Sequence, residues 1–340
     1  MAARPPPSQL SLSFAAAFTP PGRPGRELDR RNGTEYREMT CRSVLTWVQG
    51  TRASDFFSAN PYRGCEFGCA YCYARYTHEL LHELRWEDFE RHVYVKVNAP
   101  EALDRDLRRK RAMGNELRLG TATDPYQPAE RRFGVTRKML EKLLRYRGLS
   151  ISLATKSALV ERDAPLLAEL ARRHEVHVHL SCASVDAKLL RRLEPRSPTP
   201  ELRFRAMAAL AARGVTVGLL AAPVMPGLAD SEEDLVALFR RAREAGASSI
   251  LSQALFLPSA SKRRFFPWLE RNAPELYERY RRAYRGGLEP NRPAEGRSSS
   301  GPLVRGLEFE AEYRLLLARR IEAARVAAGF GGGARVLGRQ

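Results

Sequence analysis

The sequence lacks a run of about 18 apolar residues, the length that a membrane-spanning helix requires. Only the stretch from Leu10 to Phe18 is apolar enough to resemble the core of a signal peptide, and it follows Arg4. Prolines flank this stretch on both sides, and no small-residue cleavage site comes after it. We therefore expect a cytoplasmic protein that has no membrane partner.

Cysteine is also scarce, with five residues in a chain of 340. An odd number of cysteines without a secretory signal argues against a disulfide framework. Three of them, Cys65, Cys69 and Cys72, lie close together, whereas Cys41 and Cys182 stand alone. Clustered cysteines in a reducing compartment are typical of metal ligands. This segment is therefore the first candidate for a functional site.

Acidic residues are few beside the basic ones, because 39 Asp and Glu against 57 Lys and Arg give a formal net charge of +18. One interpretation is a polyanionic partner such as nucleic acid. The other is an arginine-rich composition without functional meaning, since the arginines are scattered over many expected helices instead of forming one block. The charge alone leaves both interpretations open.

Regions rich in proline and glycine divide the chain. Residues 1–40 are rich in Pro, Arg and Gly and show no periodicity, so we expect a disordered or loosely docked N-terminal arm. Residues 286–302, where Gly, Pro and Ser crowd together, are expected to be a linker. Residues 41–285 lie between them and are expected to form the main domain. Residues 303–340 are expected to contain one amphipathic helix, from Leu307 to Ala328, and a flexible tail.

Within the main domain, short apolar segments alternate with amphipathic ones, which is typical of strands followed by helices. The expected strands are residues 93–97, 116–120, 150–155, 176–182, 215–221 and 249–257. The expected helices are residues 99–111, 136–147, 199–214 and 231–246, with a further helix that begins at Asp163. This repeat predicts an α/β fold, a partial (β/α) barrel of about six to seven parallel strands between about residues 56 and 258. In such folds the functional groups lie at the C-terminal ends of the strands.

The three clustered cysteines have the spacing C-x3-C-x2-C within residues 58–73. Three thiolates on a short loop can hold three irons of a four-iron, four-sulfur cluster. Because no fourth cysteine lies nearby, the fourth iron would be open to another ligand. Gly64 and Gly68 allow the loop to fold tightly. A structural zinc site is the alternative, with His78 or His82 as its fourth ligand.

The pattern C-x3-C-x-aromatic-C, in which Tyr71 is the aromatic residue, resembles the signature of the radical S-adenosylmethionine (SAM) superfamily. The resemblance implies that Cys65, Cys69 and Cys72 bind a [4Fe-4S] cluster whose open iron chelates SAM. In that family the reduced cluster cleaves SAM to a 5′-deoxyadenosyl radical, which abstracts a hydrogen atom. The resemblance also implies that Tyr71 lies near the adenine and that an electron donor such as flavodoxin or ferredoxin is a partner.

Longer segments resemble one branch of this superfamily, the enzymes related to spore photoproduct lyase, which are often labelled DNA repair photolyase-like. The similarity extends over about residues 43–260. It is carried by residues 60–65, 72–75, 120–128, 155–157 and 222–228. The resemblance implies radical chemistry on an unknown substrate, with a DNA lesion as one candidate and RNA, a protein or a metabolite as alternatives. A non-enzymatic alternative, a nucleic-acid-binding protein stabilised by zinc or by a cluster, also stays open.

Polar residues at the expected strand ends are the candidate SAM ligands. Thr121, Thr123 and Asp124 follow one strand, and the resemblance implies that this strand end meets the amino group of the methionine moiety. Simple turn formation by the Asp-Pro-Tyr sequence is the alternative. Lys156 follows the next strand, and the resemblance implies a place near the cofactor carboxylate. An exposed lysine at the start of a loop is the alternative there.

Alternation along the strand at residues 176–182 separates two faces. We place His179 and Ser181 inside the barrel, and the resemblance implies that Ser181 hydrogen-bonds the ribose or the carboxylate of SAM. Cys182 falls on the opposite, apolar face. A packing role is the more common one for a buried cysteine. A catalytic thiol, such as the additional cysteine of spore photoproduct lyase, is the alternative for Cys182.

Three further residues complete the set of candidates. Arg203 lies on the helix that begins near Thr199 and matches an arginine of the related sequences, which implies that it reaches the cofactor carboxylate. An arginine on the helix surface is the alternative. Gln127 and Glu130 are weaker candidates for the pocket formed around Asp124.

Overall fold

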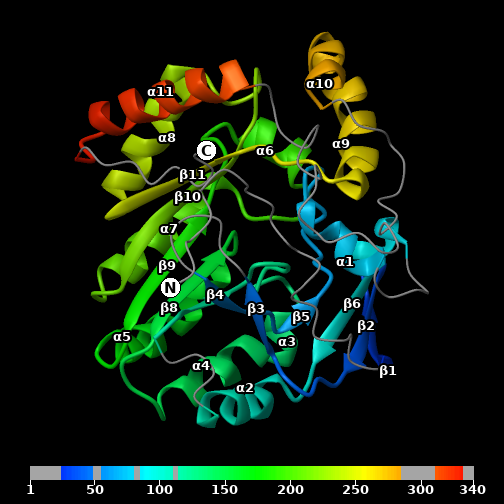
Figure 1. Ribbon diagram of the computed structural model, residues 1–340, viewed down its shortest axis with the longest axis vertical. Coiled ribbons are helices and arrows are strands. Elements are labelled where there is room, and N and C mark those ends of the chain that lie inside the picture. Colours follow the sequence, from blue (N-terminus) through cyan, green and yellow to red (C-terminus); the bar gives the residue numbers. More distant parts are fainter. Residues whose placement is uncertain (1–23, 49–54, 80–84, 110–113, 285–310, 332–340) are drawn as a thin grey trace, which may run out of the picture.

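A computed structural model describes residues 24–48, 55–79, 85–109, 114–284 and 311–331. Its main sheet has seven strands in the order β11-β10-β9-β8-β7-β4-β3 (Figure 1). The strands are β3 (Leu45–Val48), β4 (Phe56–Ala59), β7 (Glu116–Leu119), β8 (Ser150–Thr155), β9 (Glu175–Ser181), β10 (Thr216–Val224) and β11 (Ser249–Ala254). All neighbouring strands from β4 to β11 pair in parallel, and only the edge strand β3 is antiparallel. This confirms the predicted α/β fold with a mostly parallel sheet.

Crossover helices connect the parallel strands. They are α2 (Ala99–Arg108), α3 (Glu130–Phe133), α4 (Val135–Leu143), α5 (Ala164–Ala171), α6 (Ala187–Leu193), α7 (Pro200–Ala211) and α8 (Glu232–Glu244). The capping signals act as the sequence predicts: the Ser231 hydroxyl accepts a hydrogen bond from the Asp234 N–H at 3.0 Å, and Pro200 occupies the first turn of α7. Helices α5 and α7 contact β9, and α7 and α8 contact β10. Together they cover one side of the sheet (Figure 1).

The two sides of the sheet differ in character. On the side covered by helices, Leu119, Leu153 and Leu180 are at most 1% exposed. Burial of each such side chain contributes roughly 1.5–3 kcal/mol to folding. The alternate residues point to the other side, which we call the inner face. Most of its side chains are small or polar, and many of them are only half-buried. They include Arg118, Ser152, Ala154, His177, Leu220 and Gln253. The inner face is therefore accessible to solvent, unlike a close-packed barrel interior.

A second, four-stranded sheet corrects two expectations. It has the order β1-β2-β6-β5 and consists of β1 (Pro24–Arg31), β2 (Thr34–Met39), β5 (Tyr62–Arg63) and β6 (His92–Lys96). The expected loose arm therefore does not hold for residues 24–39, and the strand expected at 93–97 lies outside the main sheet. Asn32 and Gly33, with φ of 50° and 75°, form the hairpin turn between β1 and β2. An Asn-Gly pair is a strong hairpin signal, but the charged strands beside it lack the apolar alternation that is typical of strands.

The C-terminal part of the chain is helical. It contains α9 (Ser259–Asn272), α10 (Tyr277–Ala283) and α11 (Ala311–Ala327), and α11 packs on α8 and β11 (Figure 1). The helix expected at Leu307–Ala328 is thus present, whereas the expected linker and most of the tail lie outside the described residues. Short elements complete the fold: η1 (Tyr73–Arg75), α1 (Tyr76–Glu79), η2 (Trp86–Glu90), η3 (Ala158–Asp163) and η4 (Pro274–Leu276). Within the described part of the chain, none of the helices combines the length and the apolar character needed to span a bilayer.

Candidate active site

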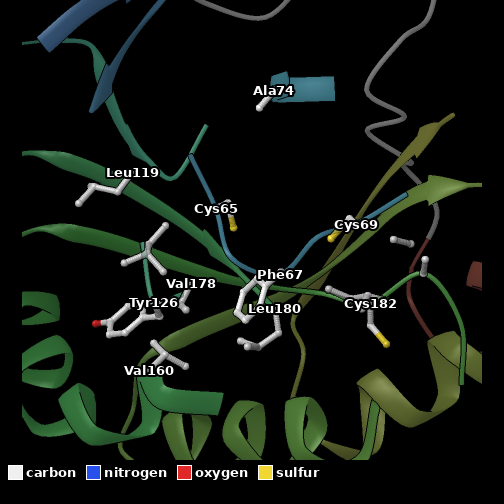
Figure 2. Close-up of a cluster of buried hydrophobic side chains, with 14 of the residues drawn as sticks. Cys65, Phe67, Cys69, Ala74, Leu119, Tyr126, Val160, Val178, Leu180 and Cys182 are labelled. Carbon is white, nitrogen blue, oxygen red and sulfur yellow. The ribbon is translucent and has the colours of Figure 1, made fainter. Parts of the chain in front are cut away.

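The three clustered cysteines lie on a loop between β5 and η1, residues 64–72, which we call the cluster loop. Backbone hydrogen bonds fix the loop at both ends. The Cys65 N–H donates to the Phe89 carbonyl at 3.0 Å, and the Ala70 N–H donates to the Leu193 carbonyl at 2.8 Å. Figure 2 shows the side chains of Cys65 and Cys69 on this loop, with Phe67 between them. The surrounding fold therefore holds the loop at both ends.

Two side chains behind the cluster loop hold its first residues. The Thr123 hydroxyl donates to the Gly64 carbonyl at 2.6 Å, and the Gln127 amide donates to the same carbonyl at 3.0 Å. The Gln127 side-chain oxygen accepts from the Glu66 N–H at 3.0 Å. The Glu66 carboxylate in turn accepts from the Tyr36 hydroxyl at 2.8 Å. The structure therefore places Thr123 and Gln127, which we expected in the SAM pocket, as supports of the loop.

Glu130 also differs from its expected place. Its carboxylate accepts hydrogen bonds from the Tyr62 hydroxyl and, at 2.8 Å, from the Thr136 N–H, and it lies 3.1 Å from the Arg162 guanidinium. The side chain is fully buried. All these partners are protein groups, so Glu130 joins β5 to the start of α4 and does not extend the pocket around Asp124.

Gly64 is the tightest point of the cluster loop. Its φ is +84°, and a Cβ at this position would lie 2.5 Å from the His92 carbonyl oxygen and 2.9 Å from that of Phe89. No L-residue fits without a shift of the backbone that carries Cys65. We expect Gly64→Ala to reduce iron incorporation severalfold and to lower the melting temperature, as measured by iron analysis after reconstitution and by calorimetry.

Gly214→Ala is the matched control for this substitution. Gly214 has a similar φ of +78°, but a Cβ there meets nothing within 4 Å. The control therefore carries the backbone strain without the steric conflict. Full iron incorporation in Gly64→Ala would show that the cluster loop does not depend on the close approach.

The donor set fits a cluster better than a single zinc ion. Burial raises the pKa of all three cluster-loop cysteines, so iron must displace their protons on binding. Within the described residues, no three Cys, His, Asp or Glu side chains converge where one metal ion could sit. Thiolates on separate corners of a four-iron cluster need not meet at one point. His78 does not join them, because its Nε2 lies 2.9 Å from the His92 carbonyl oxygen. His82 lies outside the described residues.

Asp124 ties the end of β7 to the end of β8. Its carboxylate accepts from the Thr155 hydroxyl at 2.6 Å, from the Lys156 N–H at 2.7 Å and from the Tyr126 N–H at 2.9 Å. Burial raises the pKa of Asp124 although these hydrogen bonds lower it. Thr121 plays a similar part towards β4, because its hydroxyl contacts Ser58. Both residues lie at the C-terminal ends of the strands, as expected, and are only half-buried.

Lys156 and Ser181 meet at the same edge of the sheet. The Lys156 Nζ donates to the Ser181 hydroxyl at 3.2 Å and lies 5.7 Å from the centre of the Tyr71 ring. Burial lowers the pKa of Lys156, but Glu194 and Cys69 raise it by more, so the net shift is upward. The structure therefore brings together a cationic ammonium group, a hydroxyl and an aromatic ring beside the cluster loop.

Glu194 connects these residues to Arg203. The Tyr71 hydroxyl donates to the Glu194 carboxylate, which also pairs with the Arg203 guanidinium. Burial would raise the pKa of Glu194, but the charges of Arg203 and Lys156 lower it to about 2. Arg203 also donates to the Ser181 carbonyl at 2.8 Å and to the Ser197 hydroxyl at 2.8 Å. Its guanidinium is thus bound by protein groups behind Ser181, which assigns Arg203 a positioning role.

The two isolated cysteines lie apart from this site. The Cys182 thiol contacts the Ser184 carbonyl at 3.1 Å, and its sulfur points away from those of Cys65 and Cys69 (Figure 2). Burial raises its pKa to about 11. The Cys41 thiol contacts the Asn98 side chain. Cys182 packs as a small apolar side chain, and this geometry does not support a catalytic thiol there.

Sequence reasoning did not give a role to three residues that shape the site. The Tyr73 hydroxyl donates to the Thr121 carbonyl, so this half-exposed ring bridges the cluster loop to the end of β7. The Arg75 guanidinium is fully buried and donates to the Cys69 carbonyl at 3.2 Å. The Asn60 amide oxygen accepts from the Ala122 N–H at 2.9 Å. Tyr73 and Arg75 follow the last cysteine of the motif, and all three residues lie in segments that carry the resemblance, which is the signal that the sequence offers for them.

The parallel sheet, the three cysteines on one loop and the polar residues at the strand ends define an iron–sulfur enzyme. The chain belongs to the radical SAM superfamily, whose family model matches residues 59–239. Enzymes of this superfamily use a [4Fe-4S] cluster and SAM, and the cluster loop carries the three cysteines that we expect to bind the cluster.

Relatives with similar sequences occur in bacteria, archaea and viruses. The uncharacterized protein Rv2578c of Mycobacterium tuberculosis is 38% identical over 287 residues, which cover 84% of this chain and 82% of that protein. The uncharacterized protein MJ0683 of Methanocaldococcus jannaschii is 30% identical over 219 residues, which cover 64% of this chain and 77% of that protein. These similarities extend the family across distant lineages without naming a substrate.

Solved structures of spore photoproduct lyase have a similar fold. One is a mutant with bound AdoMet and dinucleoside spore photoproduct, with a TM-score of 0.55 and 16% identity over 79% of this chain and 73% of that chain. Another is the lyase complexed with dinucleoside spore photoproduct, with a TM-score of 0.54 and 16% identity over 79% of this chain and 73% of that chain. At this identity the likeness concerns the fold alone.

Proposed function

We propose that SAM binds across the C-terminal ends of β7, β8 and β9, beside the cluster loop, and that its radical abstracts hydrogen from a substrate on the inner face. The observation that carries this proposal is the convergence of Lys156, Ser181 and Tyr71 next to the loop of three cysteines. When bound, the cluster supplies the electron that cleaves SAM to the 5′-deoxyadenosyl radical. The protein's own residues bind and orient the cofactor.

Each converging group has a task that follows from its chemistry. The Lys156 ammonium group suits the methionine carboxylate, and the Ser181 hydroxyl suits a ribose hydroxyl or the same carboxylate. Tyr71 offers an aromatic edge or face to the adenine. The half-buried Thr121 and Asp124 lie where the methionine amino group would come. Arg203 and Glu194 hold Ser181 and Tyr71 from behind.

We expect Lys156→Met to weaken SAM binding by about tenfold to hundredfold, because a charged hydrogen bond to a carboxylate is lost. Isothermal titration calorimetry on the reconstituted protein measures this change. Lys138→Met is the control, since that lysine is exposed on α4. Equal SAM affinity in wild type and Lys156→Met would remove Lys156 from the cofactor site.

The proposed activity has a direct test. The protein is reconstituted anaerobically with iron and sulfide, reduced with dithionite and supplied with SAM. Mass spectrometry then measures 5′-deoxyadenosine in the reaction mixture. Formation of 5′-deoxyadenosine supports radical generation. Its absence from protein that carries a full cluster contradicts the proposal.

A nucleic acid is the substrate class that we propose for this site. The net charge of +18 supports a polyanionic partner, and the fold is similar to that of spore photoproduct lyase. A target base in a duplex would have to leave the stack to reach the inner face. Because Cys182 faces away from the site, a hydrogen atom returned to product would come from another group than this thiol.

Salt dependence tests the nucleic-acid proposal. Binding of DNA and RNA oligonucleotides is measured by fluorescence anisotropy over a range of salt concentrations. Each neutralised phosphate contributes about 0.9 to the slope of log affinity against log salt for duplex DNA. A steep slope supports a nucleic-acid substrate, and no binding at low salt argues for a protein or metabolite. The electron would come from a donor such as flavodoxin or ferredoxin, which the same assay can use in place of dithionite.

A further inference from the structure

His179 lies on the inner face of β9, two residues before Ser181, and is only 8% exposed. Two residues of a strand span about 7 Å, so its side chain lies one level below the Lys156–Ser181 pair. Its partners in the register of the sheet are Ala154 of β8 and Gly218 of β10. Both neighbours are small, and the imidazole is therefore the one large side chain at this level of the three strands.

The position of the imidazole depends on the glycine beside it. A Cβ at Gly218 would lie 2.8 Å from the His179 Nδ1 and 2.6 Å from the Ser249 hydroxyl oxygen. Any larger residue in place of Gly218 would push the ring or the serine aside. The small neighbours on β8 and β10 thus leave space for the His179 ring on the inner face, which is otherwise accessible to solvent.

The Nδ1 of His179 is buried and has no hydrogen-bond partner among the described residues. His174 shows how a structural histidine of this chain is satisfied. Its Nδ1 accepts from the Leu149 N–H at 3.2 Å, and its Nε2 lies 3.0 Å from the Leu143 carbonyl oxygen. A buried polar atom without a partner costs free energy and calls for an explanation such as a ligand. His179 has the chemistry of a binding residue, in contrast to His174.

The surroundings keep His179 uncharged. Burial, followed by the neighbouring His177 and Arg118, lowers its pKa to about 4. Arg118 is itself neutralised by Glu116 at 2.6 Å and lies against the Phe56 ring at 4.0 Å. A neutral imidazole offers one donor and one acceptor. The acceptor nitrogen suits a neutral N–H donor and does not favour an anion.

We propose that His179 is a substrate-binding residue whose imidazole hydrogen-bonds a neutral planar group with an N–H beside a C=O, as in amides, ureas and cyclic imides. This inference rests on the proposed function, because the inner face is a substrate site only if SAM binds above it. The substrate part that enters the inner face would meet His179 directly below the Lys156–Ser181 pair. His179 would thereby select the group that faces the cofactor.

Succinimide, N-methylsuccinimide and succinate are the probes that test the inference. The first carries the N–H and C=O pair, the second lacks the N–H donor, and the third is anionic. Ligand-observed saturation-transfer NMR on the oxidised holoenzyme with SAM measures their binding. We expect succinimide to bind at least about tenfold more tightly than either analogue. Succinimide binding should be lost in His179→Leu and retained in part in His179→Asn, whose amide can replace Nδ1.

His177→Asn is the matched control, because His177 lies on the same face of β9, is half-exposed and stacks on His179. Calorimetry establishes that each variant folds. Absence of succinimide binding to wild type, equal binding of the three probes, or unchanged binding in His179→Leu would overturn the inference. Formation of 5′-deoxyadenosine without any probe is measured separately, so failure of radical generation and failure of the His179 contact give different results.

Discussion

A variant in which Cys65, Cys69 and Cys72 are all alanine is expected to bind no cluster and to form no 5′-deoxyadenosine. The three thiols lie on one loop that the surrounding fold holds in place, Cys65 and Cys69 buried and Cys72 half-buried. Without these thiolates, the cluster loop loses its expected iron ligands. Iron and sulfide analysis should fall from about four of each per chain to background. The assay for 5′-deoxyadenosine should give the value of a protein-free control.

The double variant Cys41→Ala, Cys182→Ala is the control for this loss. Both residues are buried, and their thiols contact Asn98 and Ser184 instead of the cluster loop. We expect the double variant to keep its cluster and its activity. Loss of iron in the double variant, or one zinc and no iron in the wild type, would contradict the assignment of the ligands and favour the zinc-stabilised binding protein.

Arg203→Met is expected to destabilise the protein by about 3–5 kcal/mol, the usual cost of removing one partner of a buried ion pair. Arg203 and Glu194 are at most 1% exposed, and no solvent can take over the charge of Glu194. The remaining cation, Lys156, would then be drawn towards Glu194 and away from the Ser181 hydroxyl. SAM affinity should fall together with stability. Chemical denaturation and calorimetric titration of SAM measure the two effects.

Two further variants isolate the cause. Arg205→Met removes an arginine from the same helix, but its side chain is 64% exposed and its nearest carboxylate, that of Glu161, lies 3.8 Å away. Such surface pairs contribute little, so we expect almost no change. The double variant Arg203→Met, Glu194→Gln should recover part of the lost stability, because residue 194 is then no longer a buried carboxylate without its arginine. A wild-type free energy of unfolding in Arg203→Met would show that the pair does not support the site.

Local sequence signals were sufficient to predict the helices and strands whose apolar residues recur at regular intervals. The strands β7 to β11 and the helices α2, α4, α5, α7 and α8 follow from periodicity and caps, since Leu119, Leu153 and Leu180 are buried by the same alternation that makes them recognisable. The short helices α3 and α6 were not predicted. The cysteines could also be identified, because their spacing is contained within one loop. The second sheet escaped prediction because residues 24–39 form charged strands that are joined by pairing with β6 and not by an apolar pattern.

The roles of polar residues depend on contacts between distant parts of the chain, which spacing does not contain. Thr123 lies at a strand end, as the cofactor ligands do, yet its hydroxyl binds the carbonyl of Gly64. Arg203 matches the motif, yet its guanidinium binds Glu194 and the backbone of Ser181. Only the three-dimensional arrangement shows which of these side chains faces the proposed cofactor site and which of them holds other residues of the site in place.

The anchors of the cluster loop come from segments that are synthesised much later than the loop. The backbone N–H groups of Cys65, Glu66 and Ala70 donate hydrogen bonds to Phe89, Gln127 and Leu193. All three anchors are therefore present only when more than half of the chain has been made. We therefore expect iron delivery to follow synthesis of the chain at least as far as Leu193. A nascent chain that exposes its cysteines early would present them to oxidants and foreign metals before the intended cofactor can be inserted.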